Sequence, residues 1–514
     1  MKRRDFMKYS GAVAGSAFLL EAMPGAEAYA ETAKSGGTLI WGHSETTQNI
    51  DMHQTGTAST GRVLENVHDA IVTVDHDFQL QPSLAESFEV SEDGLTYTFK
   101  LRPNVTFHNG KTMTSGDVKY SFERVKDPAT GATNFEVFND VDEIQTPDDL
   151  TVVVKMSKVN APFLARLAEN GAGVVIPEGS GDTQGEHPIG AGPFKFVSRE
   201  FGNMVKLERF DDYWDEPAYL DEVIAHEVTE PTVRLTGLRT GEFHLINDIP
   251  MDRIREIEDE GEFQVLKWAP LSWAFVNFNH QREPFNDKRV RLAIDYMIDK
   301  EALVQGALWG NGEVSASPSF PKSPSRNNNL TVRPQDFDKA RALLEEAGIA
   351  PGQIKANFKV TTNYPWHVEA SEIMLEWFRQ GGVEIDIQKL SWSDWLSQVW
   401  NARDFDMTMM NFFTLWEPDF LYYLIWHSTG AFNYRNIDDA VVDELADKAR
   451  ITIDREERIK IYHELQARMH EEALDVLLWF RNGTIAASRA VKGLENIVVP
   501  NASNLDFRKV WIDA

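Results

Sequence analysis

The chain has 514 residues, 42% of them apolar, and carries 80 acidic against 51 basic side chains, a net charge of −29 at pH 7. This charge repels nucleic acid phosphates and anionic lipid head groups, so we discount both as partners. There is no cysteine, which excludes disulfides, thiolate metal sites, a cysteine nucleophile and a lipid-anchoring cysteine. The length predicts two to four domains of about 100–200 residues each.

The first thirty residues have the pattern of a cleavable export signal. A basic start is followed by an apolar run over residues 11–20, about half of what a membrane span needs. Small residues then recur, with cleavage expected near Ala28 or Ala30. The stretch "RRDFMK" (residues 3–8) resembles a twin-arginine motif; an ordinary secretory start is the alternative. We therefore expect a periplasmic protein with no membrane anchor.

The sequence contains no complete catalytic motif among those its residues suggest. His226, His463 and His470 each precede a glutamate, but none has a second histidine four residues later, as a zinc protease helix requires. The "NGKT" at residues 109–112 lacks the first glycine of a phosphate loop. We interpret His463 and His470 as solvated helix residues and predict no enzyme. A hydrolase stays open as an alternative without specific support.

The first half of the chain contains clear strand and helix patterns. "LTYTFKL" (Leu95 to Leu101) alternates with period two after an Asp-Gly turn and predicts a strand. Thr114 and Asp117 form a capping box. Helical spacing places three apolar residues on one face of the helix that follows. They are Val118, Phe122 and Val125.

The second half predicts helices that feed strands. One helix begins after a cap at Asp287, and another ends at Gly348. A third ends at Gly381 and leads directly into the alternating strand 383–387, as in a layered α/β domain. Residues 320–330 are the most loop-like stretch. The apolar faces of the first two helices are Val290, Ile294, Met297 and Ile298, and Phe337, Ala340, Leu344 and Ala347.

Three segments, in order, resemble the peptide/nickel/opine class of extracytoplasmic solute-binding proteins, family 5, which serve ABC importers. They are "PSLAESFEVSEDGLTYTFKLRPNVTFHNGKTMTSGDVKYSFERV" (Pro82 to Val125), "PIGAGPFKF" (Pro188 to Phe196) and "VNFNHQREPFNDKRVRLAIDYMIDKEAL" (Val276 to Leu303). The second has Ala191 where the family usually has threonine. The resemblance extends from about Gly37 to the C-terminus.

The resemblance implies an α/β, periplasmic-binding-protein-like fold of two lobes (class II, cluster C type) with an additional inserted domain and a two-strand hinge. The hinge crossovers are expected near 269–277 and 480–489. The expected divisions are an export signal at 1–30, lobe I at 31–74 plus 191–275 plus 488–514, an inserted domain II at 75–190, and lobe III at 276–487.

The resemblance also implies a function. We expect a periplasmic substrate-binding protein that captures a peptide-like or other small solute between two closing lobes. Its partners would be that small-molecule or oligopeptide ligand and an ABC permease of the inner membrane. We expect a monomer with no cofactor and no metal. An opine, sugar or metal-chelate ligand is the alternative, and a periplasmic peptide-binding chaperone is an alternative of a different class.

A solute enclosed between lobes needs an apolar wall and a few convergent polar groups. Aromatic and polar residues near the expected crossovers and lobe edges are therefore the candidates, with Tyr434 and Arg435 for a carboxylate. Core packing is the alternative for each tryptophan, and solvated loop charges for Glu417 and Asp419. The candidates are Trp41, His43, Trp273, Asn277, Trp392, Trp416, Glu417, Asp419, Tyr434 and Arg435.

The sequence departs from the family where peptide ends are held. Thr414 stands where peptide-binding relatives have an aspartate for the α-ammonium, with Glu417 or Asp419 as substitutes. Thr361 and Thr362 stand where dipeptide binders have an arginine. A threonine cannot form the bidentate charged fork of an arginine. A strict dipeptide ligand is therefore less expected, and longer peptides, opines, sugars and chelated metals stay open.

Overall fold

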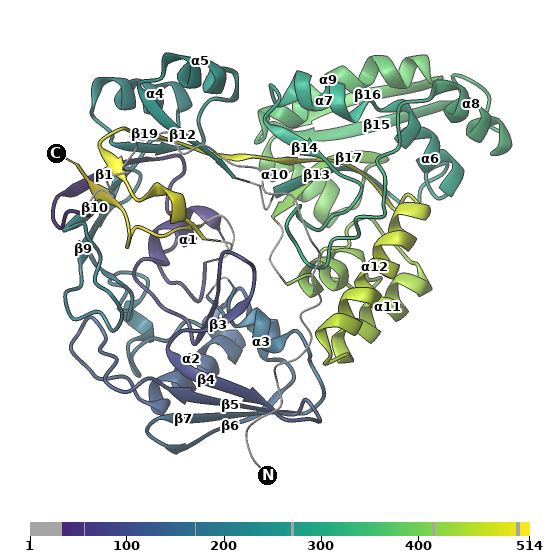
Figure 1. Cartoon of the computed structure of the whole chain (residues 1–514). Helices are drawn as coiled ribbons and strands as arrows, with labels where there is room; N and C mark the ends of the chain where they lie inside the picture. The colour runs from purple at the N-terminus through teal and green to yellow at the C-terminus, as the bar shows by residue number, and fades with distance from the viewer. Residues whose placement is uncertain are drawn as a thin grey trace, which may run out of the picture. The chain divides into compact units, whose positions relative to one another are not determined.

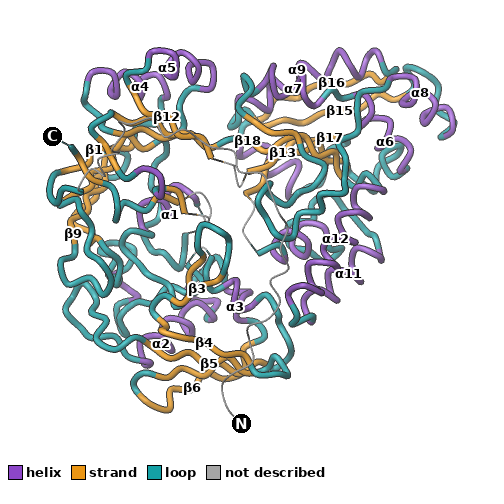
Figure 2. The backbone as a smooth tube through the Cα atoms, viewed as in Figure 1, coloured by secondary structure: helices purple, strands orange, loops and turns teal. Residues whose placement is uncertain are grey.

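The computed structural model describes residues 33–55, 57–169, 171–268, 272–413, 417–499 and 504–513. The predicted export signal, Thr414 and Trp416 lie outside these residues. Within them, no helix combines the length and the apolar character needed to cross a bilayer. The described chain is a mixed α/β protein built on sheets of seven, six and four strands (Figures 1 and 2).

The seven-stranded sheet, called the lobe I sheet, has the order β12-β19-β11-β1-β10-β9-β8. β1 pairs in parallel with β10 and β11, whereas the outer pairs are antiparallel. Helices α4 (Pro231–Thr240) and α5 (Ile254–Glu260) contact this sheet. Its strands are β1 (Thr38–His43), β8 (Phe194–Glu200), β9 (Met204–Arg209), β10 (Glu222–Glu227), β11 (Leu245–Asn247), β12 (Phe263–Trp268) and β19 (Gly483–Ser488).

The four-stranded antiparallel sheet, called the domain II sheet, has the order β4-β5-β7-β6. The predicted strand and capping box are confirmed. Leu95 to Leu101 contains β5, and the Asp117 carboxylate accepts from the Thr114 amide at 2.9 Å at the start of α2. The elements are β4 (Ala85–Val90), β5 (Thr96–Leu101), α2 (Ser115–Lys126), β6 (Val141–Asp148), β7 (Thr151–Met156) and α3 (Phe163–Arg166).

The apolar face of α2 is buried as predicted, because its three residues close the core over the domain II sheet. They are Val118, Phe122 and Val125. Helix α1 (Ala58–Leu64) precedes this region and packs on a short strand near the C-terminus. Three two-stranded ribbons complete the strands. They are β2 (Val72–Val74) with β3 (Leu80–Pro82), β20 (Val491–Lys492) with β23 (Trp511–Ile512), and β21 (Val498–Val499) with β22 (Asn504–Leu505).

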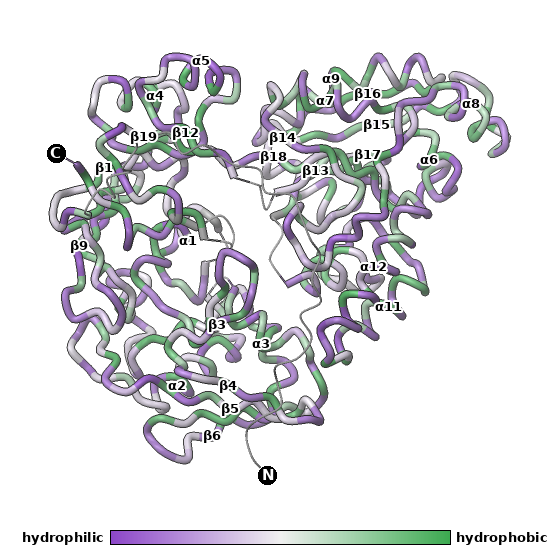
Figure 3. Tube along the Cα trace, viewed as in Figure 1, coloured by the Kyte–Doolittle hydropathy of each residue, from purple (hydrophilic) through white to green (hydrophobic). Residues whose placement is uncertain are grey.

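The six-stranded sheet, called the lobe III sheet, has the order β14-β18-β13-β17-β15-β16. Every described residue of β13 is buried, and Figure 3 shows hydrophobic residues along β13 and β17. Helix α9 (Pro365–Gln380) joins the parallel pair β15 and β16, so the predicted helix-to-strand unit is confirmed. The strands are β13 (Ser272–Phe278), β14 (Gly312–Val314), β15 (Ile354–Thr361), β16 (Val383–Leu390), β17 (Met407–Phe413) and β18 (Asp475–Arg481).

The other predicted helices of the second half are also present. The Asp287 carboxylate accepts from the Arg289 amide at 2.8 Å and caps α6, whose predicted apolar face is buried. Helix α8 ends two residues before Gly348, which has a φ of 77°. Helices α11 and α12 lie side by side in Figure 2 and contact each other. The helices are α6 (Lys288–Met297), α7 (Lys300–Ala307), α8 (Phe337–Glu346), α10 (Trp392–Trp395), α11 (Ala440–Ile451) and α12 (Arg455–Glu471).

The chain passes between the lobe I and lobe III sheets at two neighbouring places, after Trp268 and after Arg481. On the lobe I side β12 pairs with β19, with Trp268 opposite Gly483. On the lobe III side β13 pairs with β18, with Trp273 opposite Phe480. This is the two-strand connection expected of the two-lobe fold. The residue bounds of the three divisions stay a prediction.

Gly483 is the tightest point of this crossover. A Cβ at Gly483 would overlap the Trp268 indole. We expect Gly483→Ala to lower the free energy of unfolding by about 1–3 kcal/mol, the usual effect of overpacking. Thermal melting measures it. Gly185→Ala is the control, because a Cβ there meets no atom within 4 Å; equal melting of the two variants would contradict the prediction.

Candidate functional site

The buried polar cluster behind the crossover centres on Asn247, the last residue of β11. Its Oδ1 accepts hydrogen bonds from Trp41 Nε1 at 2.9 Å and from the Ser44 amide at 3.2 Å. Its Nδ2 donates to Ser44 Oγ at 2.7 Å and to Asp248 Oδ2 at 2.9 Å. Because β1 and β11 are parallel neighbours, their C-terminal ends bring these groups together.

Two of the predicted site residues, Trp41 and His43, belong to this cluster and are fully buried. His43 Nε2 lies 3.2 Å from the Ser59 carbonyl oxygen. Burial, reinforced by Arg62, lowers the pKa of His43 to about 3, so the ring is neutral. In this structure both residues position Asn247. Their contact with a solute stays a prediction.

Asp248, which follows Asn247 directly, is a charged residue of this cluster. Its Oδ2 accepts from Ser44 Oγ at 2.8 Å, and its backbone has a φ of 52°, in the left-handed region. Burial alone would raise the pKa of Asp248, but Arg62 and Arg481 hold it far below the usual range. Their guanidinium nitrogens lie 3.6 Å and 3.7 Å from the carboxylate. Asp248 is therefore ionised between two arginines.

Lobe III contributes aromatic rings to the same place. The Arg481 guanidinium lies 4.8 Å from the ring centroid of Trp366, at the start of α9. Tyr364 packs against Trp366 with ring centroids 5.5 Å apart. Burial raises the pKa of Tyr364, with Glu45 of lobe I and Arg481 among its charged neighbours. Residues of both lobes therefore meet at the crossover.

The predicted residue Trp392 is the exposed aromatic of this group. Its side chain is 36% exposed and stacks on the fully buried Trp395 at 5.4 Å, with 4° between the ring planes. Trp395 Nε1 donates to Thr408 Oγ1 at 3.0 Å, which fixes the platform. Tyr364 meets the Trp392 ring edge-on at 6.2 Å. Trp392 is thus an apolar surface next to the charged cluster.

Trp273 and Asn277, on β13, lie in the core of lobe III. Trp273 stacks between Phe275 and Trp426, with ring centroids 4.3 Å and 5.3 Å away. Asn277 Nδ2 donates to Asp475 Oδ1 at 2.7 Å. Both side chains are buried. Here the core-packing alternative describes what Trp273 does.

Tyr434 and Arg435 close the same buried network. The Tyr434 hydroxyl donates to Asn277 Oδ1 at 2.6 Å, and Arg435 Nη1 donates to Asp475 Oδ2 at 2.6 Å. A second Arg435 nitrogen donates to the Ile425 carbonyl. Arg435 is fully buried, so in this structure its charge is matched inside lobe III. Its role in holding a solute's carboxylate stays a prediction.

Glu417 and Asp419 are buried, so the alternative of solvated loop charges is wrong. The Glu417 amide donates to Glu169 Oε1 at 3.1 Å, which joins lobe III to the segment after α3. Asp419 pairs with Arg450 at 3.0 Å. Burial raises the pKa of Glu169 to about 8; Arg166 opposes this shift, and Glu417 and Asp419 add to it.

Thr361, at the position where dipeptide binders have an arginine, is fully buried. Its hydroxyl oxygen accepts from the Asn363 amide at 3.2 Å. The position is therefore used for a local turn before α9. Thr414 and Trp416 lie outside the described residues, so their places in the site stay predictions.

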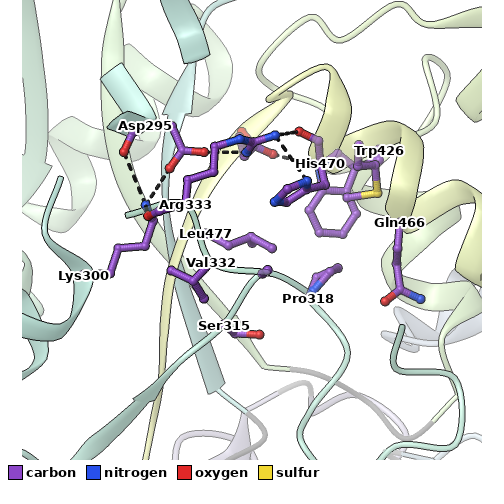
Figure 4. Close-up of a pocket in the computed structure, with 13 residues that line it drawn as sticks. Asp295, Lys300, Ser315, Pro318, Val332, Arg333, Trp426, Gln466, His470 and Leu477 are labelled. Atoms are coloured by element: carbon purple, nitrogen blue, oxygen red, sulfur yellow. Dashed lines mark hydrogen bonds and ion pairs between the residues drawn. The ribbon is translucent and has the colours of Figure 1, made fainter. Parts of the chain in front are cut away.

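A small cavity lies inside lobe III, between β18 and α12 (Figure 4). It has a volume of about 30 Å³ and is lined by Asp295, which pairs with Lys300 at 2.6 Å and Arg333 at 2.7 Å. That volume suits about two water molecules. His470 lines it, half-buried, with Nδ1 3.2 Å from Arg333 Nη2, so this helix histidine is partly solvated and partly in contact with the cavity.

A larger cavity of about 110 Å³ lies beside the lobe I and domain II segments and includes His68, Asp69, Glu169 and Arg508 in its lining. Burial raises the pKa of Asp69 to about 6. No group of three histidine, aspartate or glutamate side chains could hold a metal ion in the part of the chain that the structure describes.

Several residues of the group around Asn247 and Asp248, called the crossover cluster, were not predicted from the sequence. They are Glu45, Arg62, Asp248, Tyr364, Trp366 and Arg481. The sequence did contain a signal that could have predicted Arg481 as a site residue, because it is a charged residue at the end of an apolar strand within the expected crossover 480–489. The sequence around Arg62 and Asp248 contained no such signal, since only the tertiary fold brings α1 next to the residue that follows β11.

The sequence pattern of the family described as bacterial extracellular solute-binding proteins, family 5 middle region, matches residues 79–433. The glutathione-binding protein GsiB of Pectobacterium atrosepticum is 26% identical over 458 residues, covering 87% of this chain and 89% of GsiB. The substrate-binding protein CtaP of Listeria monocytogenes has a TM-score of 0.86 at 23% identity, covering 94% of this chain and all of CtaP. AgaA of Agrobacterium tumefaciens, solved with agropinic acid, has a TM-score of 0.77 at 28% identity, covering 93% and 99%.

Proposed function

Because the chain belongs to family 5 of the bacterial extracellular solute-binding proteins, we propose that it captures a peptide-like or opine-like solute for an ABC permease of the inner membrane. The single observation that carries the proposal is the crossover cluster. It combines an exposed aromatic platform, Trp392 on Trp395, with the charged group around Asp248. An apolar wall with a few polar groups is the usual form of a small-solute site.

The mechanism follows from the two-strand crossover. The site takes Arg62 and Asp248 from lobe I, and Trp366 and Trp392 from lobe III. A solute that contacts both sets gains affinity only when the lobes are closed, so binding shifts the equilibrium toward closure. The permease would then recognise the closed form. The solute is bound and released unaltered.

Thermal melting against a panel of solutes tests the proposal. The panel contains oligopeptides, opines, sugars and metal chelates. A true ligand at 100 times its Kd should stabilise the protein by about 2.7 kcal/mol. An unmoved melting temperature with every member would defeat the proposal. Weak binding of many unrelated peptides would favour the chaperone alternative.

Trp392→Ala should weaken binding of a solute found in this panel about tenfold, or about 1.4 kcal/mol. The reason is the loss of the exposed indole surface, while Trp395 keeps the fold. Isothermal titration calorimetry gives the affinity. Phe201→Ala, which removes another exposed aromatic ring on lobe I, is the control. Unchanged affinity for the Trp392 variant would remove this residue from the site.

A further inference from the structure

Arg481 makes few contacts for a cation at a lobe crossover. It ends β18 and lies over Trp366 at 4.8 Å, and its charged partner Asp248 is 3.7 Å away, beyond hydrogen-bond distance. Its side chain is 18% exposed. Its guanidinium donates no hydrogen bond to a described residue. The five donors of this group are therefore held in place by stacking but remain unused.

Arg62, on α1 of lobe I, is more deeply buried than Arg481 and also has unused guanidinium donors. Its side chain is 8% exposed, and its Nη1 is buried without a hydrogen-bond partner among the described residues. The closest carboxylate oxygens, on Asp248 and Glu45, are 3.6 Å and 3.8 Å from it. Leaving a buried charged donor without a hydrogen bond costs about 1–3 kcal/mol or more. Such a group needs an explanation.

Other buried arginines illustrate the hydrogen bonding expected when a guanidinium has a structural role. Arg234, beside the same cluster, donates to the carbonyl oxygens of Val228 at 2.6 Å and Asp248 at 2.8 Å. Arg291 in lobe III donates to the Ala473 and Phe285 carbonyls, both at 2.9 Å. These guanidinium groups are used by the fold. Those of Arg62 and Arg481 form ion pairs with Asp248 and Glu45 but donate no hydrogen bond to a described residue.

The charges of the cluster balance, so its unused donors rather than a net charge point to an anion. Arg62, Arg234 and Arg481 face the three carboxylates of Asp248, Glu45 and Glu230. The carboxylate of Asp248 is already held on Oδ2 by Ser44 and Asn247. It can therefore orient both arginines without saturating them.

We propose that Arg481 and Arg62 bind a carboxylate of the transported solute. This inference rests on the proposed function and narrows the solute to carboxylic acids. A planar guanidinium matches a carboxylate with two parallel hydrogen bonds, and stacking on Trp366 fixes the plane of Arg481. The position differs from the one implied by the family resemblance, where Thr361 stands.

The placement also links recognition to closure. Arg62 comes from lobe I, Arg481 from the crossover and Trp366 from lobe III. A carboxylate that bridges the two arginines fixes the crossover to lobe I. The same interaction therefore selects the solute and favours the closed form.

Isothermal titration calorimetry of the full exported chain tests the proposal with matched pairs of probes. One pair is trialanine and trialanine amide, the second is glutathione and its diester, and the third is agropinic acid and its ester. We expect the acid form of at least one pair to bind tenfold tighter than its neutral counterpart. The pairs separate a peptide terminus from an opine acid as the source of the carboxylate.

Arg481→Gln and Arg62→Gln should each reduce that preference below threefold. Arg481→Lys keeps the positive charge but loses the paired donors of the guanidinium, so its acid preference should lie between those of the wild type and Arg481→Gln. It replaces Arg481→Gln in the test if that variant melts at a lower temperature than the wild type. Arg239→Gln, an exposed cation of α4 paired with Glu256, should keep the full preference.

Two outcomes would overturn the inference while leaving the proposed function intact. They are equal binding of acid and neutral probes by the wild type, and full acid preference in the Arg481 and Arg62 variants. If none of the six probes binds the wild type but a sugar or metal chelate does, the inference also fails. If no solute of any class binds, the proposed function fails with it.

Discussion

Asp475→Ala should lower the free energy of unfolding of lobe III by about 3–5 kcal/mol, the loss expected when one partner of a buried ion pair is removed. The Asp475 carboxylate accepts from Asn277 Nδ2 at 2.7 Å, Trp426 Nε1 at 2.7 Å and Arg435 Nη1 at 2.6 Å. Arg435 is fully buried. The alanine would leave its charge without a counter-ion in the core.

Thermal and urea unfolding measure the effect. For a lobe of this size the melting temperature should fall by about 10 °C. Asp338→Ala, whose side chain is 95% exposed, is the control and should melt like the wild type. The double variant Arg435→Met, Asp475→Leu should lose less than Asp475→Ala, because no unpaired charge remains. An Asp475→Ala protein as stable as the control would contradict this account.

Glu169→Gln should stabilise the protein at alkaline pH by about 2–4 kcal/mol and leave it unchanged in acid. The Glu169 carboxyl is buried, its pKa is raised from 4.5 to about 8, and the Glu417 amide donates to its Oε1. Glutamine keeps that oxygen and cannot ionise. Of the nearby charges, Arg166 favours the carboxylate, and Glu417 and Asp419 oppose it.

The direction follows from the proton balance. The folded state holds the Glu169 proton up to about pH 8, whereas the unfolded chain releases it near pH 4.5. Stability from this group is therefore fully present below about pH 4.5 and is lost as the pH rises through about 8. Above that pH the folded wild type carries a buried carboxylate that the glutamine variant lacks.

Urea unfolding at pH 4.5 and at pH 8.5 checks the window, with circular dichroism as the probe. Glu444→Gln, an exposed glutamate of α11, is the matched control and should show no pH-dependent difference from the wild type. A Glu169→Gln difference of the same size at both pH values would mean that ionisation is not its cause.

Local patterns were enough to predict much of the fold. The capping box at Thr114, the cap at Asp287 and the strand through Leu95 to Leu101 depend on neighbours within a few residues, and all three are confirmed. Gly381 after α9 leads into β16 for the same local reason. The two-lobe fold itself came from the order of three family-like segments, which no local pattern could supply.

The site was harder, because burial there depends on strands that are distant in sequence. Composition cannot distinguish Arg435, which is neutralised by Asp475, from Arg481, which is left with unused donors. The two are in similar apolar and polar surroundings along the chain. Glu417 looked like a loop charge, but packing against segments distant in the sequence buries it, including Glu169, 248 residues earlier.

The two connections between the lobes differ in length, and the shorter one limits how far the two lobe sheets can separate at that point. From the paired residue Trp268 to Trp273 the chain has five Cα steps, whereas from Phe480 to Gly483 it has three, about 11 Å at full extension. The shorter connection therefore keeps Phe480 of the lobe III sheet and Gly483 of the lobe I sheet within that distance in any arrangement of the two lobes.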